Sequence, residues 1–297
     1  MNLPNSFSDF CGHKINRLGI GTGRLASLGA GYSANDALRL LEAAVEIGVN
    51  LIDTADSYGS ADCEKLLGKI LRRFPDHFLI ATKTGYPFCD FPGPLGLLNQ
   101  FGKKAISRMG AKPRFDADYV RKSIDGSLRR LGRERLDFFL LHDPIVPVWQ
   151  NEPLRRVIQE AKASGKIHHF GISTASPELH LIASGDPLVE FLQMPLNPER
   201  TPPPDNPLPI VANHVFGAGS LLRGGTEFSQ RIESIALTQG VSTRDILIAY
   251  ASAQPGVRCV LSGTGRAEHL KANAEAVRID IPHEVLKSLQ TAMHPIS

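Results

Sequence analysis

Cysteine is scarce in this sequence, which contains only four in 297 residues. The four are scattered, with no C-x-x-C spacing, at Cys11, Cys63, Cys89 and Cys259. This distribution argues against a disulfide framework and gives no sign of a cysteine-ligated zinc site. We expect small buried thiols in a protein of the reducing cytoplasm.

Long apolar runs and an excess of charge of one sign are also missing. No stretch reaches the roughly 18 apolar residues that a membrane span needs, and no basic segment followed by an apolar one marks a signal peptide. The 33 basic and 30 acidic residues give a formal net charge of +3, without the basic excess that nucleic-acid binding requires. We therefore expect neither a membrane nor a nucleic-acid partner, and the oligomeric state stays open.

Apolar residues, by contrast, are abundant. Hydrophobic residues make up 42% and charged residues 21% of the chain, which indicates a globular protein with a large core. Neither a break in composition nor a Pro/Ser-rich linker divides the sequence. A chain of this length is compatible with one α/β barrel, since such barrels commonly run to about 250 residues.

Short apolar runs alternate with segments of helical periodicity. Residues 78–83 form a short apolar run typical of a strand covered on both faces, and Val120, Ile124, Leu128 and Leu131 then recur at helical spacing. Strands are predicted in the same way at 17–20, 51–53, 78–83, 136–141, 167–172, 191–194, 208–212 and 257–261.

Eight strands alternating with helices favour a parallel (β/α)8 TIM barrel over residues 1–297, with a short N-terminal hairpin and a C-terminal helix. Residues 33–36 resemble a capping box that opens a helix ending at Gly48. The competing fold is a doubly wound sheet, whose fingerprint is nearly present at residues 21–26. Two further glycines follow where that fold requires a helix to begin at once, so we favour the barrel.

Polar residues stand where strands end. Asp53, Lys83 and His142 close the second, third and fourth predicted strands, and Tyr58 follows in the next loop. The carboxyl ends of barrel strands converge on one mouth, where an acid, a phenol, an ammonium and an imidazole suit proton donation to a carbonyl. We expect Lys83 to lower the pKa of Tyr58, Asp53 to hold Lys83, and His142 to orient the substrate oxygen.

These motifs resemble those of the aldo-keto reductases. The resemblance rests on Leu51-Ile-Asp53-Thr-Ala-Asp-Ser-Tyr58-Gly, Ala81-Thr-Lys83-Thr and Leu140-Leu-His142-Asp-Pro, and it continues through residues 165–174 and 263–273. It implies NAD(P)H-dependent reduction of an aldehyde or ketone to an alcohol, or the reverse. It also implies that Tyr58 is the general acid/base and that His142 binds substrate.

The resemblance marks a cofactor site as well. Ser173 and Gln193 would hold the nicotinamide carboxamide, Thr174 stands where the family often has asparagine, and His214 or Phe216 would stack on the nicotinamide ring. Spacing does not choose between the last two. The residues that the resemblance assigns to the cofactor are Gly21, Thr22, Gly23, Asp53, Ser173, Thr174, Gln193, His214, Phe216, Gly217, Gly219, Gly263, Thr264, Arg266, His269 and Asn273.

The choice between NADPH and NADH depends on a cation for the 2′-phosphate. Gly263 and His269 occupy positions that are basic in NADPH-specific family members, which leaves Arg266 as the nearest guanidinium. We expect NADPH, with NADH possible.

No metal site is expected. His168 and His169 are adjacent on a predicted strand, so their side chains should point to opposite faces and cannot jointly chelate an ion. The sequence also lacks H-x-H and H-E-x-x-H motifs, which disfavours a metal-dependent hydrolase.

Two further features have an open interpretation. Trp149, the only tryptophan, either lines a substrate pocket or packs under a loop. Residues 91–115 are rich in basic residues and have no acidic one, so they form either a lid favouring anionic substrates or a solvated loop or subunit contact.

Two alternative functions use the same residues. A cofactor-binding regulatory subunit on this fold would keep Asp53, Tyr58, Lys83 and His142 intact. A Schiff-base lyase or isomerase would need a nucleophilic Lys83, and the acid and phenol beside it would keep its amine charged instead.

Overall fold

The computed structural model describes residues 6–25, 32–88, 112–203 and 205–291. Within them, ten strands form one two-stranded hairpin and one closed eight-stranded barrel. The hairpin strands are antiparallel, whereas all neighbouring barrel strands are parallel. The strands are β1 (Phe7–Phe10), β2 (His13–Asn16), β3 (Leu18–Gly21), β4 (Leu51–Asp53), β5 (Leu79–Thr84), β6 (Leu136–His142), β7 (Ile167–Ser173), β8 (Phe191–Pro195), β9 (Ile210–Asn213) and β10 (Val257–Ser262).

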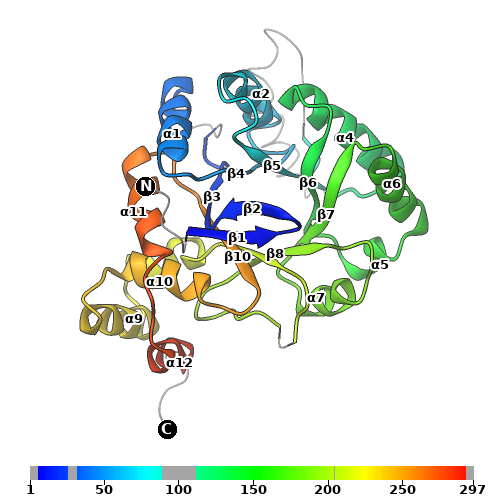
Figure 1. The fold of residues 1–297 in the computed structure, drawn as a ribbon. Helices are drawn as coiled ribbons and strands as arrows, with labels where there is room; N and C mark the ends of the chain where they lie inside the picture. The colour runs from blue at the N-terminus through cyan, green and yellow to red at the C-terminus, as the bar shows by residue number, and fades with distance from the viewer. Residues whose placement is uncertain (1–5, 26–31, 89–111, 204, 292–297) are drawn as a thin grey trace.

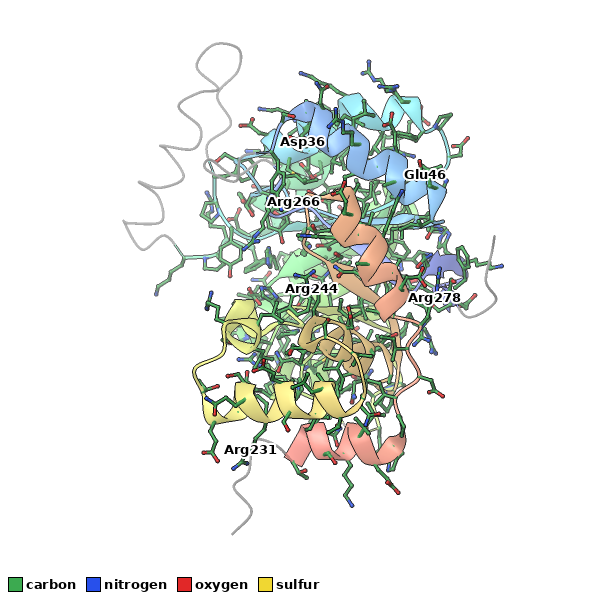
Figure 2. All side chains as sticks on the ribbon, turned by 90° about the vertical axis from the view of Figure 1, so that its left-hand side faces the viewer. Asp36, Glu46, Arg231, Arg244, Arg266 and Arg278 are labelled. Atoms are coloured by element: carbon green, nitrogen blue, oxygen red, sulfur yellow. The ribbon has the colours of Figure 1, made fainter. Side chains whose placement is uncertain are left out.

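Helices surround the barrel, and the hairpin lies across its centre when the molecule is viewed along the barrel (Figure 1). Figure 2 shows that α1 (Ala34–Glu46) and α11 (Ala267–Ala276) run in roughly the same direction, from Asp36 to Glu46 and from Arg266 to Arg278. The helical segments are α1 (Ala34–Glu46), α2 (Asp62–Ile70), η2 (Leu71–Arg73), α4 (Ala117–Leu131), α5 (Val146–Trp149), α6 (Glu152–Ala163), α7 (Pro177–Ser184), η4 (Gly217–Gly219), α8 (Ser220–Arg223), α9 (Glu227–Thr238), α10 (Thr243–Ser252), α11 (Ala267–Ala276) and α12 (His283–Thr291). Among the described helices, none has the length and apolarity to cross a membrane.

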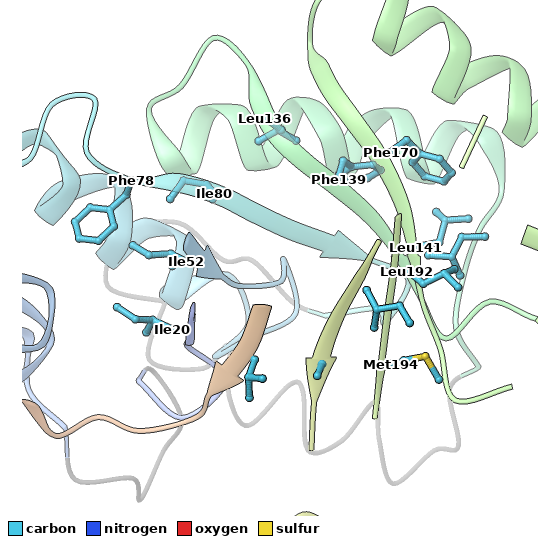
Figure 3. Close-up of a cluster of buried hydrophobic side chains, with 14 of the residues drawn as sticks. Ile20, Ile52, Phe78, Ile80, Leu136, Phe139, Leu141, Phe170, Leu192 and Met194 are labelled. Atoms are coloured by element: carbon cyan, nitrogen blue, oxygen red, sulfur yellow. The ribbon is translucent and has the colours of Figure 1, made fainter. Parts of the chain in front are cut away.

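Strand residues alternate between the inside of the barrel and the layer under the helices. Ile52, Ile80 and Phe139 belong to the outer apolar layer (Figure 3), while Leu51 and Ala81 belong to the interior cluster. This alternation follows from the two-residue period of a strand, and it places every second side chain of each strand inside the barrel.

The hairpin closes the barrel at the amino ends of the strands. Phe10 and Ile15 are buried in the interior cluster, and the Phe10 ring lies 4.8 Å from that of Phe138 and 5.1 Å from that of Phe191. Because Phe138 and Phe191 stand at the beginnings of β6 and β8, the hairpin fills this end and leaves the carboxyl ends as the mouth.

The structure confirms the predicted barrel, its N-terminal hairpin and its C-terminal helix. All eight predicted strands are present within one or two residues of their predicted ends. Ser33 and Asp36 form the predicted capping box at the start of α1, and Gly48 follows the helix with a φ of 73°. The doubly wound alternative is excluded because the sheet closes between β10 and β3.

Candidate active site

Five of the predicted site residues face the mouth from inside the barrel. Asp53 and Lys83 follow the inward-facing Leu51 and Ala81 by two residues, so they share the interior face. The strand register places His142 opposite Ser173 and Ser173 opposite Gln193. The apolar core below therefore gives way to polar side chains at the last inward position of each strand.

Asp53 is the centre of a buried hydrogen-bond network. Its Oδ1 accepts bonds from Lys83 Nζ at 2.6 Å and from Gln193 Nε2 at 2.7 Å. Ser173 Oγ donates to Gln193 Oε1 at 2.8 Å, and Lys83 also donates to the carbonyl of Thr54 at 2.9 Å. Because these side chains are all buried, each is held in one orientation by its partners.

Lys83 is a permanent cation in this setting. Burial by itself would lower the pKa of the 2% exposed ammonium, but the charge of Asp53 and the contact with Tyr58 outweigh it, so the pKa of Lys83 is raised. A Schiff-base mechanism needs a free amine, which this shift disfavours.

Tyr58 lies against both Lys83 and the loop after β3. The Lys83 Nζ is 5.4 Å from the centre of the Tyr58 ring, and a Cβ on Gly23 would lie 3.6 Å from that ring. The prediction that the pKa of Tyr58 is lowered is wrong: burial raises it, and the lowering effect of Lys83 is smaller than that of burial, while Asp53 raises it further. The phenol is therefore protonated at neutral pH.

His142 completes the group. Its ring centre is 6.2 Å from that of Tyr58 and 4.9 Å from that of Tyr86, edge to face in both cases. Sequence reasoning missed Tyr86, whose hydroxyl donates to Asp143 Oδ2 at 2.9 Å. The Tyr86 pKa is raised to about 12 by burial and by the Asp143 carboxylate, so this phenol also stays protonated. Tyr86 lies in the loop after β5 and does not end a predicted strand, so the spacing of the strand ends could not identify it.

A cleft of about 360 Å³ opens beside His142 and Ser173. The remaining lining combines polar and apolar groups and comes largely from the carboxyl ends of β6, β7, β8 and β9 and the loops after them, namely Asp143, Thr174, Ala175, Pro195, Asn197, Glu199, Arg200, Asn213, His214, Gly217 and Ala218. Of these lining residues, the sequence marked Thr174, His214 and Gly217 for the cofactor and none for the substrate.

The structure separates the two candidates for stacking on a nicotinamide ring. His214 is exposed, has a φ of 47°, lines the cleft and contacts Asn213 Oδ1 through Nδ1 at 3.0 Å. Phe216 packs instead against the apolar layers beneath the loop. Gly217 lines the cleft, and Gly219, with a φ of 89°, is the N-cap residue before α8.

The predicted phosphate segment has features that fit a dinucleotide. Arg266 stands at the amino end of α11 and its side chain makes no capping hydrogen bond among the described residues, so first-turn N–H groups there can face an anion. A Cβ on Gly263 would meet no atom of the described part of the chain within 4 Å, so the strand end is open there. Asn273 donates to Ser262 Oγ at 2.8 Å, while its buried Oδ1 has no partner among the described residues.

The other predicted cofactor residues lie nearby along the same rim. Gly21 ends β3, and both the N–H and the hydroxyl of Thr22 donate to the Asp53 carbonyl at 2.9 Å. Thr264 accepts the Arg266 N–H at 3.1 Å, and His269 is half-buried on α11.

Trp149 is part of the core, which contradicts the substrate-pocket interpretation and favours packing under a loop. It is 1% exposed, stacks on Phe170 at 5.6 Å and carries the Arg155 guanidinium 4.5 Å above its ring. The short helix α5 turns the indole inward against β7, so it packs under the loop. Most of the basic segment 91–115 lies outside the described residues.

The structure also corrects the prediction that His168 and His169 cannot share an ion. Their ring centres are 4.2 Å apart, and both rings approach His13 of the hairpin, at 5.2 and 5.3 Å. The alternation of a strand fixes the direction of each Cβ but not the final position of an imidazole ring. The position of His13 is set by the packing of the hairpin against the barrel.

Comparison with known proteins agrees with the fold and the motifs. Residues 17–293 match the model described as the aldo/keto reductase family. The chain is 28% identical to the 6-dehydroglucose reductase of Novosphingobium aromaticivorans, over 93% of this chain and 92% of that protein. It is also 28% identical to the D-threo-aldose 1-dehydrogenase of a Pseudomonas species, over 91% of this chain and 92% of that protein. The structure of aldo-keto reductase AKR11C1 from Bacillus halodurans, in its holo form, shares the fold with a TM-score of 0.79 at 20% identity, covering 97% of this chain and 96% of that one.

Proposed function

The chain belongs to the aldo/keto reductase family, and from this premise we propose that Tyr58 exchanges the proton in its NAD(P)H-dependent oxidoreduction of carbonyl compounds. When bound, the nicotinamide cofactor supplies or accepts the hydride. The residues of this chain then have to bind the substrate oxygen, move its proton and stabilise the charge that develops on it.

The role of Tyr58 follows from its protonation state and its neighbours. Its raised pKa keeps the phenol ready to donate to a carbonyl oxygen that is becoming an alkoxide. The Lys83 ammonium stabilises the phenolate left behind, and Asp53 holds that ammonium in place through the 2.6 Å ion pair. In the oxidation direction the same phenolate removes the proton from an alcohol.

His142 orients the substrate oxygen from the other side. Its ring stands edge to face with Tyr58 at the mouth, in reach of an oxygen bound in the cleft that it lines. The single observation that carries the proposal is the buried Asp53–Lys83 pair beside the Tyr58 ring, because it fixes a cation where the phenolate of a proton-donating Tyr58 would form.

We propose NADPH as the preferred cofactor. The uncapped amino end of α11 and the exposed Arg266 supply N–H groups and a cation for the 2′-phosphate. His214 is the stronger candidate for stacking on the nicotinamide, since it lines the cleft whereas Phe216 packs into the apolar layers.

The cleft supports a polar carbonyl compound as substrate. Asn197, Glu199, Arg200 and Asn213 offer donors and acceptors for hydroxyl groups on the substrate chain. Two of the relatives are named for sugar chemistry, which makes aldoses and oxidised sugars the first compounds to test. We also place the reaction in the cytoplasm, which the free thiols of Cys11, Cys63 and Cys259 support.

The test is the loss of NADPH absorbance with a panel of aldehydes, ketones and sugars, run with wild type and Tyr58→Phe. We expect Tyr58→Phe to lose about 10²- to 10⁴-fold in kcat, the usual contribution of a general acid, while NADPH binding stays intact. Tyr250→Phe, in the apolar cluster away from the mouth, is the matched control and should keep wild-type kcat.

Turnover of Tyr58→Phe within a few-fold of wild type would remove Tyr58 as the proton donor. The comparisons give no support to the regulatory-subunit alternative, and it would return only if wild type bound NADPH tightly and reduced no member of the panel.

A further inference from the structure

Three histidines meet at the end of the barrel opposite the catalytic mouth. His13 begins β2 in the hairpin, and His168 and His169 are the second and third residues of β7. One ring nitrogen from each lies within 4.8 Å of one from each of the others. His13 and His168 are 155 positions apart in the sequence, and they come together because the hairpin closes the barrel beside β7.

A carboxylate orients the most buried of the three rings. His169 Nδ1 lies 2.8 Å from Glu190 Oε1, and Glu190 is itself held by Lys162 and by the Phe170 N–H at 3.0 Å. Because Lys162 and the Phe170 N–H both donate to Glu190, its carboxylate is the acceptor toward His169 and Nδ1 is the donor.

This arrangement leaves the other nitrogen of His169 without a partner. Its Nε2 is buried and makes no hydrogen bond within the described residues. A buried polar atom with no partner is uncommon and indicates a missing ligand, ion or water. A histidine whose Nδ1–H is held by a carboxylate is also the usual preparation of a metal-binding Nε2.

We propose that His13, His168 and His169 bind a divalent transition-metal ion of the zinc class, which links the hairpin to β7. Imidazole ligands suit Zn²⁺, Ni²⁺ and Cu²⁺, and three of them leave one tetrahedral position for water. Zinc–nitrogen bonds of about 2.05 Å place ligand nitrogens about 3.4 Å apart, so nitrogens now within 4.8 Å of one another approach by up to about 1.4 Å on binding.

The surroundings permit this movement. His168 is exposed and His13 half-buried, so both rings can turn toward the fixed His169. Among the nearby charges, Asp9 and Asp137 favour a cation at this site and Arg135 opposes it.

The consequence is mechanical rather than catalytic. The ion would fasten the segment that closes the bottom of the barrel, while the carbonyl chemistry belongs to the other end. Metal binding is thus expected to raise thermal stability and to leave carbonyl reduction unchanged.

The test uses tag-free, chelator-stripped protein titrated with Zn²⁺ against a chromophoric chelator, with the melting temperature measured in parallel. We expect about one equivalent of Zn²⁺ per chain and, at a hundredfold excess over Kd, a rise in Tm of about 5 °C. His169→Asn keeps a donor toward Glu190 but lacks the second nitrogen, and His13→Ala removes the ligand from the hairpin. Both variants should lose the binding and the rise in Tm.

His283→Ala, which removes an exposed histidine from the start of α12, is the matched control and should bind Zn²⁺ as wild type does. All variants should retain wild-type carbonyl reduction. The proposal is overturned if wild type binds no stoichiometric Zn²⁺, or if His13→Ala and His169→Asn bind it as tightly as wild type.

Discussion

Replacing the buried Asp56 by asparagine should change the stability of the protein by an amount that depends strongly on pH. Asp56 is 1% exposed, and its Oδ2 accepts the hydroxyls of Thr84 at 2.7 Å and Ser123 at 2.6 Å, while Oδ1 has no partner in the described structure. Burial and then the charge of Glu64 raise its pKa from 3.8 to about 7, against the lowering effect of the two hydroxyls and of Arg130.

Whether the protein gains or loses stability as the pH rises depends on whether the folded or the unfolded chain holds the proton of Asp56. Below pH 3.8 the carboxyl is neutral in both the folded and the unfolded chain, and between about pH 4 and 7 only the folded chain keeps the proton. The stability associated with Asp56 is therefore fully present at low pH and is lost as the pH rises through the folded-state value. The folded pKa lies about 3 pH units above the unfolded one, at about 1.4 kcal/mol each, so the loss reaches about 4 kcal/mol.

Asparagine has nearly the same shape and no such dependence on pH. The free energy of unfolding of Asp56→Asn minus that of wild type should therefore rise by about 4 kcal/mol from pH 4 to pH 8, whatever constant cost the unpartnered amide adds. Urea unfolding at several pH values measures this difference. The exposed Asp280→Asn is the matched control and should show little change. A difference for Asp56→Asn that is flat across this range would refute the reasoning.

Three further variants test separate parts of the structure. Arg266→Ala should weaken NADPH relative to NADH by about tenfold, as expected for one exposed charge-assisted contact, and an unchanged ratio of kcat/KM values for the two cofactors would contradict the assignment. Trp149→Ala should lose about 3 to 5 kcal/mol of stability in denaturant titrations, because it empties the space over Phe170, and soluble enzyme should keep the wild-type KM unless the indole contacts substrate after all. Asp53→Asn leaves Lys83 as a buried, unpaired cation and should cost about 3 to 5 kcal/mol of stability together with most of kcat, whereas a stable variant with normal kcat would show that the ion pair is dispensable.

The sequence was sufficient for the fold because most barrel strands are short and largely apolar, and segments of helical periodicity separate several of them. Strands such as 51–53 and 136–142 are covered on both faces, and their high content of apolar residues indicates this burial. Asp53, Lys83 and His142 could then be identified from the strand ends. Because every second side chain of a strand points inward, each of them follows an interior residue and lies at the mouth.

Properties set by tertiary packing could not be obtained in this way. The pKa of Tyr58 was predicted from its charged neighbour alone, and the larger effect of burial depends on how the loop after β3 covers the ring. Trp149 was placed by its position after a strand, whereas the direction of α5 decides where the indole lies. His13 lies close to His168 and His169 because the hairpin packs against the barrel, and no local sequence pattern predicts where the hairpin packs.

The central claim, that Tyr58 exchanges the proton with the substrate oxygen, is tested most directly by the pH dependence of single-turnover hydride transfer in both directions. The account predicts a reduction rate that is constant from about pH 6 to 8, because burial keeps Tyr58 protonated, and an oxidation rate that rises with pH over the same range. Tyr58→Phe should lose both rates. A reduction rate that falls through the usual histidine range of about pH 6 to 7, and that survives in Tyr58→Phe, would identify His142 as the donor and contradict the claim.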